Sequence, residues 1–201
     1  MAKSFVPEKP DRKILLMRHG AAGNQLRDVL SCYPEKFHNP LTSEGKRVVE
    51  ASAKELKDEG IDMIFSSDLL RARQTAQIVH QKTGAPVRLD QRLREHNGGI
   101  FNGQHDSKFW GWLEARHDIY RTRLPQGESL QSFYNRALAF IREIMTDRRY
   151  QDKTILVVSH GFILATIEGI IGGKTLQEIV ATKRFQPEKA IKPGYFRQLK
   201  F

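Results

Sequence analysis

Residues 13–20 read Lys-Ile-Leu-Leu-Met-Arg-His-Gly, a short aliphatic run that ends in an arginine and a histidine. Residues 154–161 read Thr-Ile-Leu-Val-Val-Ser-His-Gly and have the same form. Short runs rich in aliphatic and β-branched residues are typical of strands that are buried on both faces of a parallel sheet. We expect four such strands, at Lys13–Met17, Ile61–Phe65, Val87–Leu89 and Thr154–Val158.

Amphipathic helical stretches separate these strands. Apolar residues recur three and four positions apart between residues 130 and 145, and capping residues precede two other stretches. The expected helices run from a cap at Thr42 or Ser43 to Glu59, which Gly60 follows; from a cap at Ser67 or Asp68 to Lys82; and from Leu130 to Met145. Strands that alternate with helices indicate an α/β fold with a largely parallel sheet.

The 201 residues fit one domain, and we expect residues 1–201 to form it. A segment rich in aromatic residues and arginines, about residues 100–125, interrupts the alternating pattern, and we expect a helix around Asp106–Tyr120 within it. Because inserted regions often cover a site, we interpret this segment as a lid whose arginines could hold a second anionic group of a substrate. The alternative is a packed helix with a solvated basic face.

The composition indicates an intracellular protein without an internal disulfide. Cys32 is the single cysteine, and no spacing of cysteine and histidine suggests a zinc site. Residues 1–13 are polar and lack the apolar core of a signal peptide. No apolar run is long enough to cross a membrane. We therefore expect a cytoplasmic protein with no membrane span.

The formal net charge of +10 favours acidic partners, such as phosphorylated metabolites, nucleic acid or an anionic surface. The excess gathers in a basic C-terminal tail, about residues 183–201, which contains one acidic residue, Glu188. The basic residues of the tail are Lys183, Arg184, Lys189, Lys192, Arg197 and Lys200. We interpret the tail as a solvated segment, and docking on an acidic partner is the alternative.

Residues that can carry chemistry follow the expected strands. They are Arg18, His19, Arg71, Glu95 and His160. Ligands of open α/β sheets bind beyond the carboxyl ends of the strands, so these side chains could converge on one crevice. Arginine binds phosphate, neutral imidazole is a nucleophile near neutral pH, and a carboxylic acid can protonate a leaving group. Such a set fits phosphoryl transfer without a metal, because the arginines and histidines supply the positive charge.

Each of these residues also has a structural interpretation. A histidine at the end of a strand most often only packs there. Arg71 could be a surface residue of its helix, as Arg73 could be. Glu95 could be a loop carboxylate that pairs with Arg92 or Arg94. Position along the chain therefore supports a site only modestly.

Several motifs, taken together and in order, resemble the signatures of the histidine phosphatase superfamily, which is also called the phosphoglycerate mutase-like family. The motifs are Arg18-His19-Gly20, Pro40-Leu41-Thr42 with Gly45, the run Ser66–Ala76, Leu93-Arg94-Glu95 with Gly99 and Gly103, Gly127-Glu128-Ser129, and Ser159-His160-Gly161. The resemblance covers about residues 13–172. It implies a three-layer α/β/α sandwich with a mostly parallel central sheet.

The resemblance also implies a role for each matching residue. His19 would attack phosphorus and become phosphohistidine, and Glu95 would protonate the leaving alkoxide and then activate water. The residues implied to bind the phosphoryl group are Arg18, Arg71, His160, Gly20 and Asn24. The resemblance implies neither a metal nor another cofactor.

Three departures from the family pattern favour a phosphatase over a mutase. Ala21-Ala22-Gly23 follows the first histidine motif, His96-Asn97-Gly98 follows Glu95, and Phe162-Ile163 follows the second histidine motif. We therefore expect hydrolysis of a small phosphorylated metabolite, with phosphoglycerate mutase-type transfer as the alternative.

An alternative of another class is a basic module without catalysis, held by its tail to nucleic acid or a membrane. The presence of both histidines, both arginines and Glu95 opposes this alternative, and we do not expect a nucleic-acid partner. The sequence leaves the oligomeric state open.

Overall fold

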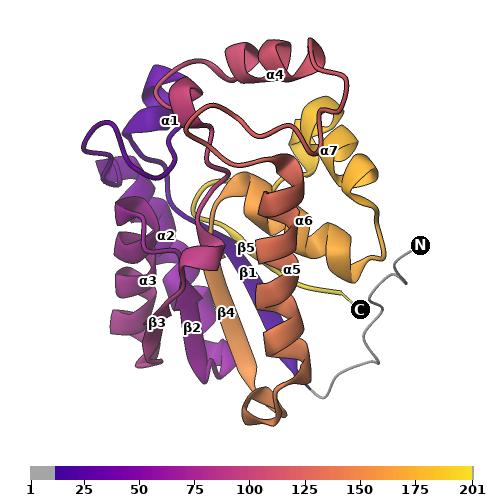
Figure 1. Cartoon of the computed structure of the whole chain (residues 1–201). Helices are drawn as coiled ribbons and strands as arrows, with labels where there is room; N and C mark the ends of the chain where they lie inside the picture. The colour runs from indigo at the N-terminus through magenta and orange to yellow at the C-terminus, as the bar shows by residue number, and fades with distance from the viewer. Residues whose placement is uncertain (1–11, 201) are drawn as a thin grey trace.

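A computed structural model describes residues 12–200, in which a five-stranded sheet lies between helices (Figure 1). The strands are β1 (Lys13–Arg18), β2 (Met63–Ser66), β3 (Val87–Leu89), β4 (Thr154–Ser159) and β5 (Phe196–Gln198). Their order across the sheet is β3-β2-β4-β1-β5. The first four strands of the chain are parallel, and β5 is antiparallel to β1. The polar N-terminal stretch, in which no signal peptide is expected, falls largely on residues 1–11, outside the described residues.

Seven α-helices accompany the sheet within residues 12–200. They are α1 (Gly23–Arg27), α2 (Ser43–Leu56), α3 (Leu70–Thr83), α4 (Asp106–Glu114), α5 (Leu130–Thr146), α6 (Gly161–Ile171) and α7 (Leu176–Phe185). Short 3-10 turns lie at Lys57–Glu59, Gln91–Leu93, Gly99–Phe101, Arg148–Tyr150 and Pro187–Lys189. No helix of this part of the chain is long and apolar enough to cross a membrane.

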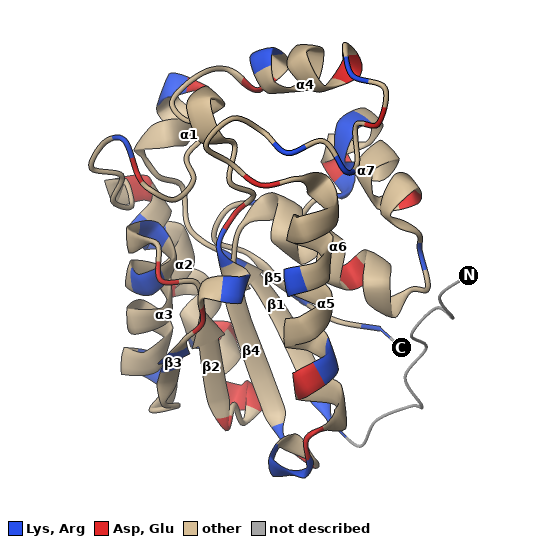
Figure 2. Ribbon diagram, viewed as in Figure 1, with Lys and Arg blue, Asp and Glu red and all other residues tan. Residues whose placement is uncertain are grey.

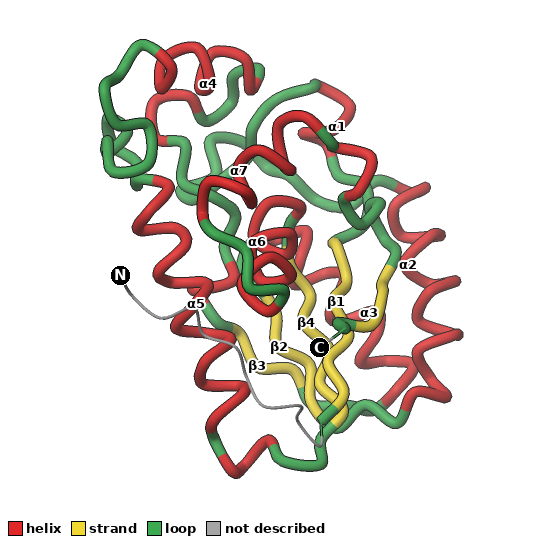
Figure 3. Tube along the Cα trace, turned by 90° about the vertical axis from the view of Figure 1, so that its right-hand side faces the viewer, coloured by secondary structure: helices red, strands yellow, loops and turns green. Residues whose placement is uncertain are grey.

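Helices cover both faces of the sheet, so the expected three-layer α/β/α sandwich is confirmed (Figure 3). Successive residues of β1 point to opposite faces, as in any strand. Leu15 and Met17 pack in the cluster that α2 and α3 complete, while Ile14 and Leu16 pack in the cluster that α5 and α6 complete. Because both faces of β1 and β4 are buried, these strands are nearly continuous apolar runs.

The strand at Val87–Leu89 is present, but the expectation that it is buried on both faces is wrong. All three residues of β3 are exposed, and Leu89 is 50% exposed. The physical reason is that β3 forms the edge of the sheet and pairs with β2 alone.

Capping side chains begin α2 and α5 as expected but not α3. Thr42 accepts a hydrogen bond from the backbone N–H of Gly45, and Ser129 caps α5. The residue before α3 is Leu69, which makes no side-chain cap, so the expected cap at Ser67 or Asp68 is wrong. Both side chains are engaged elsewhere, as described below.

Two segments differ from the sequence expectation in extent. The helix expected around Asp106–Tyr120 is α4, which ends at Glu114. The C-terminal region is not a solvated tail throughout, because residues up to Phe185 complete α7 and Phe196–Gln198 adds β5 to the sheet. In Figure 1, α4 lies at the top, beyond the carboxyl ends of β1 and β4.

Candidate active site

His19 directly follows β1 and is held as a neutral imidazole with a defined tautomer. Its Nδ1 lies 2.7 Å from the backbone carbonyl of Gly20. A carbonyl oxygen only accepts, so Nδ1 carries the proton and Nε2 carries the lone pair. The Nε–H of Arg71 donates to Nε2 over 3.1 Å. This arrangement leaves the nucleophilic nitrogen of His19 beside a guanidinium group.

The pKa of His19 lies well below its ordinary value of 6.5. Burial is the largest cause, and the positive charges of Arg71 and Arg18 lower the pKa further; the contact with Gly20 opposes them. The side chain is 3% exposed, so water does little to stabilise an imidazolium. His19 is therefore neutral at physiological pH, the form in which imidazole is a nucleophile.

Arg71 lies in the first turn of α3 and is 1% exposed. Its guanidinium is 2.7 Å from the carboxylate of Glu35 and donates to the hydroxyl and carbonyl oxygens of Ser31. Burial lowers the pKa of Arg71, and Glu35 and Glu95 oppose this effect. An arginine remains charged even so. The structural alternative of a surface residue is wrong for Arg71, because the side chain is buried beside His19.

The C-terminal segment holds Arg18. The guanidinium donates to the carbonyl of Ile191 over 3.2 Å. The backbone N–H of Gly194 donates to the carbonyls of both Arg18 and His19, at 3.1 and 3.0 Å. Burial lowers the pKa of Arg18, and the charge of Glu95 opposes this. Residues far along the chain thus fix the backbone that carries the first histidine motif.

His160 lies at the start of α6, with its ring centroid 5.0 Å from that of His19. Its Nε2 is 2.8 Å from the hydroxyl of Ser67. Within residues 12–200, its buried Nδ1 has no hydrogen-bond partner. Burial and then the charge of Arg71 keep its pKa well below 6.5. Ser67 therefore positions the second histidine, which explains why it does not cap α3.

Glu95 is held by backbone N–H groups. One carboxylate oxygen accepts from His96 over 2.9 Å, and the other accepts from Phe162, in the first turn of α6, over 3.1 Å. The alternative pairing of Glu95 with Arg92 or Arg94 is not found. Arg92 pairs with Asp90 and Glu143, and Arg94 pairs with Asp68.

Most of these side chains meet at one cavity of about 160 Å³, which residues of α4 also line. The lining residues are Arg18, His19, Asn24, Gln25, Val29, Leu30, Ser31, Arg71, Glu95, His96, Asp106, Phe109, Trp110, Gly161, Phe162 and Lys183. His160 does not line it but lies directly behind His19. Phe109 and Trp110 of α4 form an aromatic wall of the cavity, whereas the arginines at 116, 121 and 123 do not line it.

Of the two other residues expected to bind the phosphoryl group, Asn24 lines the cavity and Gly20 does not. Asn24 lines the cavity, and its side chain contacts Asn39 and the carbonyl of Val29. Gly20 does not line it; its N–H donates to Thr75, and its carbonyl orients His19. The backbone of Gly20 therefore contacts His19 and Thr75 and not the cavity.

Four polar residues of the site receive no site role from the sequence. They are Ser31, Glu35, Ser67 and Lys183. Ser67 directly follows β2, whereas Ser31 and Glu35 lie in the loop before α2 and Lys183 lies in the distant helix α7. Within residues 12–200, no three His, Cys, Asp or Glu side chains are grouped so that they could hold a metal ion.

Comparison with known proteins places the chain among phosphatases and mutases. GpmB of Escherichia coli, a probable phosphoglycerate mutase, is 32% identical to this chain over 171 residues. The match covers 80% of this chain and 75% of that protein. A Hydrogenobacter thermophilus protein named for phosphoserine phosphatase is 27% identical over 176 residues, 84% of this chain and 82% of that protein.

A solved structure, YhfR of Bacillus stearothermophilus, superimposes with a TM-score of 0.77 at 24% identity, over 93% of this chain and 90% of that chain. The model of the histidine phosphatase superfamily, branch 1, matches residues 14–185, which include both histidine motifs. With two buried histidines facing each other at the ends of β1 and β4, the chain belongs to the histidine phosphatase superfamily.

Proposed function

We propose that the protein hydrolyses small phosphomonoesters through a phosphohistidine on His19. The observation that carries this proposal is the state of His19: a neutral, buried imidazole whose Nε2 lone pair faces the Arg71 guanidinium. A nucleophile beside fixed cations suits attack on an anionic phosphoryl group, because the cations offset the charge that opposes the approach.

In the first step, the Nε–H of Arg71 leaves His19 Nε2 and turns to a phosphoryl oxygen. The freed lone pair of Nε2 forms a bond to phosphorus while the ester P–O bond breaks. Arg18 and Arg71 bind the phosphoryl oxygens, and His160 stabilises the group from behind His19. The carboxyl group of Glu95 gives its proton to the leaving alkoxide. The carbonyl of Gly20 accepts from Nδ1–H and stabilises the positive charge that develops on the ring.

In the second step, a water molecule attacks phosphorus and the N–P bond breaks. The carboxylate of Glu95 takes a proton from this water, which restores the acid for the next turnover. His19 returns to its neutral form, and inorganic phosphate leaves. The two arginines supply the donors for the phosphoryl oxygens in both steps, and His160 supports His19 from behind, so we expect activity without a metal or another cofactor.

The size of the cavity favours a small substrate. A volume of about 160 Å³ is below the roughly 300–1,000 Å³ of pockets that enclose drug-sized ligands. Phe109, Trp110 and Phe162 make much of the wall apolar. We therefore expect a phosphorylated metabolite with a short carbon skeleton.

Mutase activity is the second candidate, and the likeness to GpmB favours it. The two activities share the phosphohistidine and differ in whether water or a second substrate group accepts the phosphoryl group. Incubation with 3-phosphoglycerate and a bisphosphoglycerate primer separates them. Isomerisation faster than release of phosphate would establish the mutase.

The His19→Ala variant tests the proposal. We expect it to lose nearly all hydrolysis of p-nitrophenyl phosphate, because the variant lacks the imidazole whose Nε2 lies beside the Arg71 guanidinium. His117→Ala serves as the matched control, since His117 is exposed and outside the cavity. Thermal unfolding of each variant verifies that it folds. A folded His19→Ala protein with undiminished activity would overturn the mechanism.

A further inference from the structure

The last turn of α7 carries Lys183, which lines the same cavity as His19, Arg18 and Arg71. We propose that Lys183 forms a subsite for a second anionic group of the substrate, a carboxylate or a second phosphate. This inference rests on the proposed function, since it concerns the ester that the same cavity binds. It assigns recognition of the substrate body to the C-terminal helix instead of the lid arginines.

Packing fixes the position of α7 beside the cavity. Leu176, Ile179 and Val180 are buried in the core that α6 shares. At the other end, Arg184 forms an ion pair with Glu114 at the end of α4 and lies 4.8 Å above the ring of Trp110. Figure 2 shows basic residues where the end of α7 approaches α4. The neighbour of Lys183 thus ties the helix to the wall of the cavity.

Among the described basic residues that line the cavity, Lys183 differs from Arg18 and Arg71 because its charged group has no hydrogen-bond partner. Arg18 and Arg71 hold hydrogen bonds within the site. Within residues 12–200, the ammonium group of Lys183 makes neither a hydrogen bond nor an ion pair, although the side chain is half-buried. A charge that is partly removed from water gains most from a ligand of opposite charge.

The lid arginines are directed to other partners. Arg116 stacks on Trp112 at 4.1 Å, and Arg123 donates to the carbonyl of Gly127. Neither residue lines the cavity. These arginines therefore cannot hold a second anionic group of a substrate in this cavity. Lys183 does line the cavity and can hold such a group.

Acidic groups of the cavity limit where the second anion can lie. Glu95 faces the phosphoryl side, and Asp106, at the start of α4, is 3.6 Å from His105. The anion must approach Lys183 and avoid Asp106. A substrate that also carries an ammonium group could place it near Asp106, so the subsite accepts both a phospho-hydroxy acid and a phospho-amino acid.

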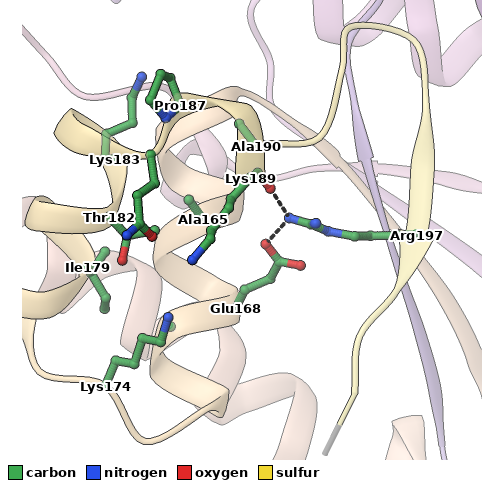
Figure 4. A pocket seen from close by; sticks show the side chains of 12 residues that line it. Ala165, Glu168, Lys174, Ile179, Thr182, Lys183, Pro187, Lys189, Ala190 and Arg197 are labelled. Carbon is green, nitrogen blue, oxygen red and sulfur yellow. Dashed lines mark hydrogen bonds and ion pairs between the residues drawn. The ribbon is translucent and has the colours of Figure 1, made fainter.

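A neighbouring cavity of about 330 Å³ between α6, α7 and β5 provides matched controls (Figure 4). The stem of Lys183 forms part of its wall, but the side chain extends away from the ammonium groups of Lys174 and Lys189, which point inward. Arg197 and Glu168 pair across the same cavity. Lys189 therefore offers the same loss of charge on the same face without contact with the catalytic cavity.

Two pairs of esters that differ in a carboxylate test the subsite. They are 3-phosphoglycerate with glycerol 3-phosphate, and O-phosphoserine with O-phosphoethanolamine. In the wild-type protein we expect kcat/KM to favour the carboxylate member of at least one pair by about tenfold, the effect of one charge-assisted contact that is partly exposed to solvent. In Lys183→Gln this ratio should fall to about one, and Lys183→Arg should retain most of it.

Lys189→Gln should keep the wild-type ratio. A ratio in Lys183→Gln equal to that of the wild type, or an equal loss in Lys189→Gln, would overturn the subsite while phosphate release continues. If the wild-type protein released phosphate from none of the four esters nor from p-nitrophenyl phosphate, the proposed function would fail and the subsite with it. Loss of the ratio in Lys183→Gln alone supports the proposal.

Discussion

At the scale of single residues, the site works by burying charge beside a neutral base. Burial, and then the charges of Arg71 and Arg18, keep the pKa of His19 well below its ordinary value, and both arginines also lose hydration. The Nε2 of His19 accepts a hydrogen bond from Arg71, and its Nδ1–H donates to the carbonyl of Gly20. These two contacts fix one orientation and one tautomer of the imidazole. His19 is therefore neutral at a pH where a free histidine in water would be partly protonated, and neutral imidazole is the form that can act as a nucleophile.

The sequence was sufficient to place this group of residues but not its supports. Arg18, His19 and His160 follow apolar runs, and parallel strands bring their carboxyl ends to one edge of the sheet, so their convergence follows from pattern alone. Ser67 and Glu35 are common surface residue types in loops. The contact of Glu35 with Arg71 depends on how the chain between β1 and α2 folds back over α3, which no local pattern encodes. The contact of Ser67 with His160 depends on the pairing of β2 with β4.

At the scale of elements, the close approach of α2 to the loop after β1 holds the first histidine motif. A Cβ atom at Gly45 would lie 2.1 Å from the carbonyl oxygen of Ala21, and one at Gly20 would lie 2.7 Å from the carbonyl oxygen of Gly45. Only hydrogen atoms fit between these backbones. This contact gives a physical reason for the glycine three residues after Thr42 in the second motif.

Replacing Gly45 by alanine should therefore separate α2 from the loop that carries His19. We expect the free energy of unfolding to fall by about 1–3 kcal/mol, the usual cost of an overpacked contact, and hydrolysis of p-nitrophenyl phosphate to fall with it. Gly111→Ala is the matched control, because this helical glycine has open space around its Cβ position. It should be stabilised by about 0.5–1 kcal/mol. Equal stability of the two variants in urea unfolding would contradict the packing argument.

The edge strand β5 shows where element prediction from sequence reaches its limit. Its residues, Phe-Arg-Gln, form no apolar run, and two of the three are exposed. What places them is backbone pairing with β1, from Leu15 to Met17. Such pairing leaves no side-chain pattern, whereas the buried strands β1 and β4 and the long amphipathic helices α2 and α5 do leave one. The basic residues of this region therefore suggested a solvated tail.

At the scale of the whole molecule, three buried histidines couple folding to pH. His19, His96 and His160 each have a pKa below the ordinary value of 6.5, with burial as the largest cause. As the pH falls through about 6.5, the unfolded chain binds protons that the folded protein does not bind. The unfolded state then gains stability relative to the folded state, so the protein should become less stable in mild acid.

His96 allows this coupling to be measured. Burial lowers its pKa to about 4, and its ring packs against Phe109 and Phe133 at 5.3 and 5.1 Å. Because His96 binds a proton more readily in the unfolded chain, it should lower the unfolding free energy of the wild-type protein by about 2 kcal/mol between pH 7 and pH 5. Between pH 7 and pH 5, the free energy of unfolding of His96→Phe should therefore fall by about 2 kcal/mol less than that of the wild type, as measured by urea unfolding. Parallel pH profiles for this variant and the wild type would show that His96 is not buried in its neutral form.

The most direct test of the central claim is to locate the covalent intermediate. In Glu95→Gln the second step lacks its base, while p-nitrophenolate leaves readily without an acid, so the phosphorylated enzyme should accumulate. We would quench this variant after reaction with radiolabelled p-nitrophenyl phosphate and map the label by peptide mass spectrometry. The expected result is an acid-labile, base-stable phosphoryl group on His19, which disappears in the His19→Ala background. A label on any other residue, or turnover by a folded protein with no label on His19, would contradict the mechanism.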